Sequence, residues 1–187
     1  PGGGPPPGGP PPSNLACTFH IETLKTFPSV GFNQGNNPQA ADQEIGRFRV
    51  SLATDNGCSP SSNLELASFN LKFTWTGLTE ATLANRRLRP ALRMVKIVDP
   101  ATSQRIDTSG NVTVALPVRP TFPGVKRSFV FGTNSRPVIT SSRDPNMGGG
   151  AIPTSREFSV RADTTAVRGG QTDGVVTLAV QVAQEQT

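Results

Sequence analysis

Short bursts of alternating apolar and polar residues, each ended by turn-forming residues, constrain the fold of this chain more than any other feature. The most regular burst is the last, in which Val176, Leu178, Val180 and Val182 alternate with Thr177, Ala179 and Gln181. A period of two places successive side chains on opposite faces of an extended strand, so each burst predicts a half-buried β-strand. About eight bursts follow one another without an internal repeat, which predicts an all-β sandwich or barrel.

The expected strands are spread over the chain after residue 16. They lie near residues 17–24, 47–52, 64–76, 91–99, 112–116, 129–131, 158–160 and 176–182. The 19 Gly and 18 Pro suit the many turns that such an arrangement needs. Residues 78–90 alone have a helical pattern, which Pro90 limits to a turn or two. Residues 132–153, with Gly148-Gly149-Gly150, predict a long loop.

The first twelve residues consist only of proline and glycine. Such a tract has no side chain to contribute to a core, and its prolines donate no backbone hydrogen bond. We therefore expect residues 1–14 to form an arm and residues 15–187 to form a single β-domain. The arm is either a flexible or polyproline II-like segment, or an extended segment that docks on another copy of the protein.

The charge is mildly basic, with 18 Lys and Arg against 13 Asp and Glu. Nucleic-acid binders concentrate positive charge in a stripe or tail. The densest basic run here consists of Arg86, Arg87, Arg89 and Arg93, which is more typical of a solvated face than of an anion site. No apolar stretch approaches the roughly 20 residues of a membrane span. We therefore expect neither nucleic-acid binding nor membrane insertion.

The residue types of known catalytic and metal sites do not gather in this sequence. His20 is the only histidine, and it alternates on the face opposite Phe19 and Ile21, which predicts an exposed strand residue. Many of the acids lie at expected turns, where they cap backbone groups: Asp55, Asp99, Asp107, Asp144 and Asp173. The triple glycine lacks the Lys-Ser/Thr pair of a phosphate loop. No catalytic residue, cofactor or metal is expected, and the chain is not predicted to be an enzyme.

Trp75 leaves two interpretations open. Its indole would suit a sugar-stacking platform, but it lies in phase with Leu71 and Phe73, which favours a place in the core. The two cysteines also leave two interpretations open. Cys17 and Cys58 are too few for a metal site and too far apart for a two-cysteine redox motif, so they form either one disulfide or two buried free thiols.

Several features coincide in a pattern known from one family. Cys17 lies in the first expected strand and Cys58 follows the second. Residues 91–99 and 158–162 form a mid-chain and a penultimate strand, and residues 167–170 form the loop after the latter. Gly174, fourteenth from the last residue, precedes the final strand. In these features the chain resembles the pilin subunits of chaperone–usher fimbriae over most of residues 15–187.

This resemblance implies an immunoglobulin-like β-sandwich that lacks its last strand, with a Cys17–Cys58 disulfide. A neighbouring subunit would fill the gap by adding its N-terminal extension as a strand. The open edge would be formed by Gly174, Val176, Leu178, Val180 and Val182, and the donor arm would include Pro5, Pro6, Pro7, Pro10, Pro11 and Pro12. The implied partners are copies of the chain itself, with a periplasmic chaperone and an outer-membrane usher during assembly.

The arm differs from the alternating apolar extension of such pilins, because prolines would interrupt the ladder and glycines would leave core pockets empty. Either the arm inserts in a polyproline II-like form, which we prefer, or it packs between filaments. The sequence thus favours a structural subunit of an extracellular fimbria, exported through the periplasm. The alternatives are a shell protein of jelly-roll type, and a secreted carbohydrate-binding module that uses Trp75 and the 132–153 loop.

Overall fold

The computed structural model describes residues 17–26, 41–52, 63–77, 90–117, 123–140, 154–167 and 177–183. Nearly all regular structure in these ranges is antiparallel β-strand, with one short 3₁₀ turn at Thr133–Ser135. The predicted all-β fold is therefore confirmed. The predicted arm at 1–14, the helical stretch up to residue 89 and the triple glycine lie outside the described residues.

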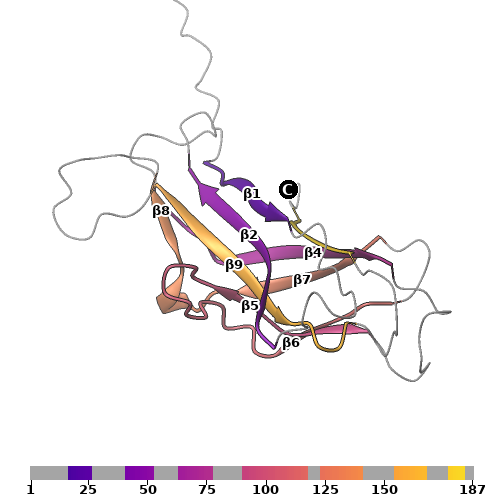
Figure 1. The fold of residues 1–187 in the computed structure, drawn as a ribbon. Coiled ribbons are helices and arrows are strands. Elements are labelled where there is room, and N and C mark those ends of the chain that lie inside the picture. Colours follow the sequence, from indigo (N-terminus) through magenta and orange to yellow (C-terminus); the bar gives the residue numbers. More distant parts are fainter. Residues whose placement is uncertain are drawn as a thin grey trace, which may run out of the picture.

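The described strands form two larger sheets and one small one. Sheet I has the order β1 (His20–Thr26), β2 (Gln43–Ser51), β9 (Ser155–Asp163), β5 (Ala91–Val98) and β6 (Val112–Ala115). Sheet II has the order β10 (Thr177–Val182), β4 (Ser68–Thr76) and β7 (Val125–Val130). β3 (Asn63–Glu65) and β8 (Val138–Thr140) form a two-stranded pair. Figure 1 shows β2 and β9 crossing β4 and β7, so the two larger sheets lie one over the other.

The core lies between the two larger sheets and is filled by the side chains that the alternation predicts. Phe48 and Phe158 lie opposite each other on neighbouring strands of sheet I, and both are buried. Phe69 of sheet II meets Phe158 edge to face, with ring centroids 5.0 Å apart. Val180 of β10 lies close to Gly46 of β2. A β-carbon added at Gly46 would lie 3.4 Å from the β-carbon of Val180. The apolar phase of the bursts thus sets which face of each strand is inward.

Two expectations about the second half of the chain need correction. The burst at Phe158 and Val160 is no short strand, because β9 has nine residues and pairs with β2 on one side and β5 on the other. The expected loop at 132–153 contains β8, in which buried Ile139 lies opposite Leu64 of β3. A strand of three residues is too short to show a period of two, so the sequence pattern could not reveal it.

The expected position of Met94 in an apolar strand is also wrong in detail. Met94 has a φ of 50° and is 54% exposed, whereas Val95 is buried. The pairing of β5 shifts register at this point toward both β6 and β9. A β-bulge of this kind inserts one unpaired residue and turns the following side chains to the opposite faces.

Candidate assembly edge at strand β10

His20 is exposed, as predicted. Within the described ranges, no group of three or more His, Cys, Asp or Glu side chains is placed to hold a metal ion. Among the same residues, no helix is long and apolar enough to cross a membrane. Asp99 accepts a hydrogen bond from the Ala101 N–H at 2.8 Å, which is the predicted capping role.

Asp107 caps a turn as predicted, and its carboxylate is also buried and binds groups outside that turn. It is 5% exposed, and its carboxylate accepts hydrogen bonds from the backbone N–H groups of Ile97 at 2.7 Å and Ser109 at 3.0 Å. Arg105 donates two further hydrogen bonds to it, at 3.0 and 2.8 Å. A buried carboxylate is stable only when it is paired and hydrogen-bonded, and this one is both. It fixes the segment 105–109 against the end of β5.

The segment 105–109 also joins the two sheets at their β6 and β7 edges, a side of the sandwich that we call the bridged side. Thr108 donates its N–H to the Val130 carbonyl of β7 at 2.8 Å, and Val130 donates its N–H to the Ser109 hydroxyl at 2.8 Å. A β-bridge pairs Asp107 with Phe131. The backbone is thereby paired continuously from sheet I to sheet II on this side.

On the opposite side of the sandwich, β1 and β10 are the edge strands, and we call this the unbridged side. Figure 1 shows β10 passing close to β1. Among the described residues, no β-bridge joins these two strands, and β10 pairs only with β4. One edge of β10 therefore has no described strand hydrogen-bonded to it.

The register of β10 shows which backbone groups face that edge. Ala183 donates its N–H to the Asn70 carbonyl of β4 at 2.7 Å. In an antiparallel pair the hydrogen-bonded residues alternate, so Gln181, Ala179 and Thr177 also direct their backbone groups toward β4. The N–H and C=O groups of the intervening residues Leu178, Val180 and Val182 then point to the outer edge. These are three of the residues that the sequence predicts for an open edge.

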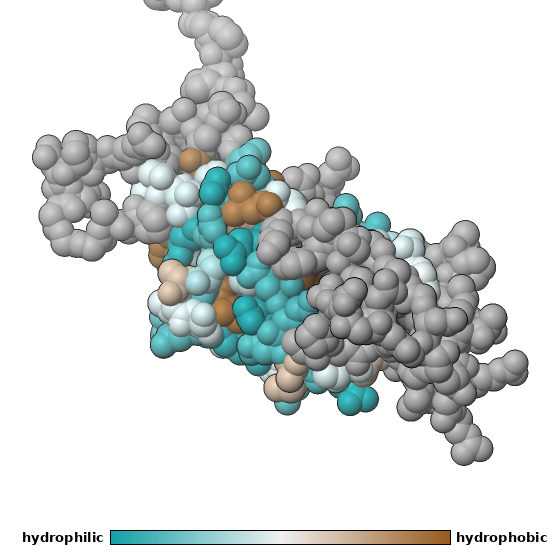
Figure 2. Space-filling model, viewed as in Figure 1, coloured by the Kyte–Doolittle hydropathy of each residue, from teal (hydrophilic) through white to brown (hydrophobic). Residues whose placement is uncertain are grey.

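The side chains at the unbridged side are apolar and incompletely covered. Leu178 and Val180 are buried in the core, whereas Val182 is partly buried against it. From the β1 side, Cys17, Phe19 and Ile21 also pack against the core while remaining partly exposed. Figure 2 shows hydrophobic surface near β1 beside a largely hydrophilic face. An added strand would cover this half-buried apolar surface.

Other predicted site residues are placed only in part. Gly174, Val176 and the donor arm with its six named prolines lie outside the described residues. Cys17 carries no free thiol. Its predicted partner Cys58 lies outside the described residues, so the Cys17–Cys58 pairing stays a prediction.

Trp75 and Arg93 are both described. Trp75 packs against the core and donates its indole N–H to the Pro117 carbonyl at 3.1 Å, an arrangement that matches the core interpretation. Arg93 is exposed and lies near the Asp163 carboxylate, whereas the other three arginines of its run lie outside the described residues.

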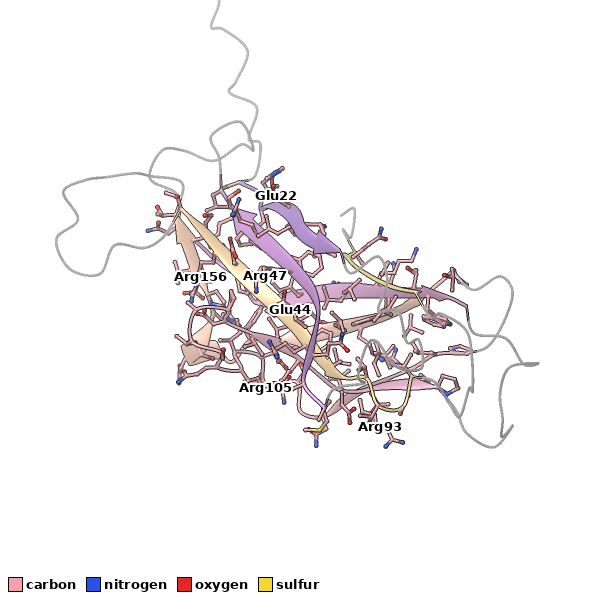
Figure 3. The ribbon with its side chains drawn as sticks, in the orientation of Figure 1. Glu22, Glu44, Arg47, Arg93, Arg105 and Arg156 are labelled. Atoms are coloured by element: carbon pink, nitrogen blue, oxygen red, sulfur yellow. The ribbon has the colours of Figure 1, made fainter. Side chains whose placement is uncertain are left out.

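The outer face of sheet I carries a network of ion pairs that the sequence did not single out. Glu22, Arg49 and Glu157 lie in register on β1, β2 and β9, and Arg49 binds Glu22 at 3.3 Å and Glu157 at 2.9 Å. Figure 3 shows Glu44 and Arg47 over the middle of the same sheet, and these two side chains are 2.7 Å apart. The sequence shows the charged residues of β2, but their partners on neighbouring strands follow only from the strand order.

Asp42 extends this network to β5 and β9. Its carboxylate accepts a hydrogen bond from Arg161 at 3.0 Å and forms an ion pair with Lys96 at 3.2 Å. Burial by itself would raise the pKa of Asp42, but the hydrogen bonds and charges of Arg161 and Lys96 outweigh burial and lower the pKa. Most described charges of this face are thus paired with one another.

No protein-family model matches the chain, and no curated protein matches it.

Proposed function

We propose that this chain is a structural subunit of an extracellular fimbria-type filament, and that subunits join when a strand from a neighbour is added at the outer edge of β10. The observation that carries the proposal is the edge itself. Its outward backbone groups belong to Leu178, Val180 and Val182, and half-buried apolar side chains lie beside it. Strand addition at such an edge gains main-chain hydrogen bonds and covers apolar surface together.

The strand order supports the immunoglobulin-like part of the proposal. An immunoglobulin sandwich has strands A, B, E and D in one sheet and C, F and G in the other. Here β1, β2, β9 and β5 occupy the positions of A, B, E and D, in the correct chain order. β4 and β10 occupy the positions of C and F. No described strand occupies the position of G, which is the outer edge of β10.

The first experiment is an unheated, non-reducing SDS gel of the native material, run beside a boiled sample. Strand-exchanged polymers resist SDS without heat because every bond of the added strand must break at once. We expect a ladder that collapses on boiling to a monomer near the calculated mass of 19.7 kDa. A single monomer band in both lanes would contradict the proposal.

A matched pair of proline variants places the contact on one edge. Proline removes a backbone N–H, which is tolerated where that N–H does not belong to a ladder. Val182→Pro removes an N–H that faces the outer edge, so we expect a folded monomer that does not polymerise. Gln181→Pro removes an N–H directed at Lys72 of β4, so we expect a destabilised monomer. If Val182→Pro forms normal filaments, the outer edge of β10 is not the assembly site.

A further inference from the structure

The two sheets differ in how their charges are compensated. On sheet I, the arginines of β2 and β9 and Lys96 of β5 all have an acidic partner within ion-pair distance. The strands of sheet II contain no acidic residue and three basic ones, Lys72, Lys126 and Arg127. None of these three forms an ion pair with a described acid. The described part of sheet II is therefore locally cationic.

The two lysines are directly opposed on neighbouring strands. Lys72 of β4 is the register partner of Lys126 of β7. Lys72 alternates with buried Leu71 and Phe73, so it lies on the outer face of the sheet. Lys126 lies three residues before buried Phe129 and therefore on the opposite face of β7, which is also the outer face. Cross-strand neighbours have β-carbons about 5 Å apart, and like charges at that separation destabilise a sheet. An anionic group held between the two ammonium groups would convert this repulsion into attraction.

The backbone beside the pair is shaped to receive the Lys72 side chain. Gly124, just before β7, has a φ of 97°, a conformation that glycine adopts readily. A β-carbon at this position would lie 2.7 Å from the Phe73 carbonyl oxygen and 3.1 Å from the Cε atom of Lys72. The absence of that β-carbon lets the lysine stem lie close against the edge of the sheet.

Most neighbouring residues of this face have uncharged hydrogen-bonding side chains, and Val130 near its end is a 50% exposed apolar residue. Register places Ser128 beside Asn70 and Gln181 beside Lys72, and Thr74 and Thr76 continue the row along β4. The described part of this face has no aromatic side chain, whereas single-stranded nucleic acids are held by aromatic stacking. Duplex binding relies on many phosphate contacts from basic residues, more than the two lysines of this face supply. Recognition of an anionic lipid surface uses clusters of about four to eight basic residues, more than are present here.

We infer that the outer face of sheet II binds an acidic polysaccharide, with Lys72 and Lys126 holding one sulfate or carboxylate group and the surrounding amides and hydroxyls contacting sugar hydroxyls. Lysine serves this role as a point charge with several donor directions. The net charge of +5 favours approach of any polyanion. The inference does not depend on the proposed function, because the face is separate from the outer edge of β10 and is present in one subunit.

The test uses the full chain, with immobilised heparin as the sulfated polysaccharide and single-stranded DNA as the competing polyanion. We expect retention on heparin, and at least a tenfold loss of affinity in the Lys72→Gln/Lys126→Gln variant. The slope of log affinity against log salt concentration should become shallower by roughly one for each lysine removed. The matched control is Arg93→Gln/Lys96→Gln, which removes the same charge from sheet I and should change affinity less than about twofold.

Two outcomes would overturn the inference directly. The first is an equal loss of heparin affinity in the Arg93→Gln/Lys96→Gln control, because net charge would then explain binding. The second is DNA bound as tightly as heparin with the same dependence on Lys72 and Lys126. A further variant, Lys126→Glu, guards against misfolding because it places an opposite charge across from Lys72. It should raise or maintain the melting temperature and abolish heparin retention, and a lower melting temperature would contradict the repulsion on which the inference rests.

Discussion

The two sides of the sandwich are closed by different means. On the bridged side, the segment 105–109 hydrogen-bonds both to β5 and to β7, so the backbone is paired from one sheet to the other. On the unbridged side, β1 and β10 lie near each other, but β10 pairs only with β4 among the described strands. One core can therefore support a sheet edge that is bridged at the end of β7 and a sheet edge that no described strand bridges.

The chemistry of the two sides differs as well. The bridged side is held by the carboxylate of Asp107, which is buried and has four hydrogen bonds. The unbridged side relies on partly exposed apolar side chains such as Phe19 and Val182. Apolar contact is non-directional and can be shared with an incoming strand, whereas a satisfied polar network has one geometry. Because of this difference, we expect a neighbour's strand to add at β10 and not at β7.

The largest expected effect compares a phenylalanine from each side. Phe131 is 1% exposed and packs against the ring of Phe69, so Phe131→Ala should lower the free energy of unfolding by about 4 kcal/mol. Phe19 is only partly buried, so Phe19→Ala in the monomer should cost about 1–2 kcal/mol. Urea denaturation of both variants measures the difference. Equal losses would mean that the two sides are packed alike.

The next effect tests the polar anchor of the bridged side. Asp107→Ala removes the acceptor of two backbone N–H groups and leaves Arg105 without its partner, so we expect a loss of about 3 kcal/mol. The control is Asp99→Ala in the same hairpin. Asp99 accepts the Ala101 N–H and lies 3.6 Å from Arg156 at a partly exposed position, and we expect a loss near 1 kcal/mol. A similar small loss at both positions would contradict the anchoring role of Asp107.

A smaller effect concerns the bulge in β5, next to the bridged side. Met94 has a φ of 50°, which costs a residue with a β-carbon about 1–2 kcal/mol. Met94→Gly relieves that strain, but glycine also increases the conformational entropy of the unfolded chain. We therefore expect the free energy of unfolding to rise by a net of about 0.5 kcal/mol. Met94→Ala keeps the β-carbon and should give no gain. A gain with alanine equal to that with glycine would show that exposure of the methionine, and not its backbone, was unfavourable.

The smallest effect is a pH dependence shared by both sides, because Asp42 contacts the middle strands. Its pKa is lowered in the folded protein, so its stabilising contribution is complete above the unfolded pKa near 3.9 and is lost as pH falls through the folded pKa. Asp42→Asn should therefore reduce stability at pH 7 and flatten the decline in unfolding free energy as the pH falls below the unfolded pKa. Parallel curves for the variant and the native chain would contradict this assignment.

Much of the fold could be predicted from the sequence, and little of the site geometry. The alternation around Phe69, Leu71 and Phe73 predicted a strand and its inward face, and both are confirmed. It also placed Leu178 and Val180 inward on the last strand. The anchoring role of Asp107 could not be predicted, because a turn acid and a buried acid have the same local sequence. Its partners are set by which strands lie beside it.

The amino-acid pattern sets the local features, because side-chain direction in an extended backbone depends on a period of two. That period indicates where strands run and which side chains face inward. The long-range features come from the folded arrangement: the strand order, the bulge that exposes Met94, the pairing of Lys72 with Lys126, and the difference between the two sides of the sandwich. These features depend on pairing between segments far apart in the chain. Short-range periodicity carries no information about which segments become neighbours.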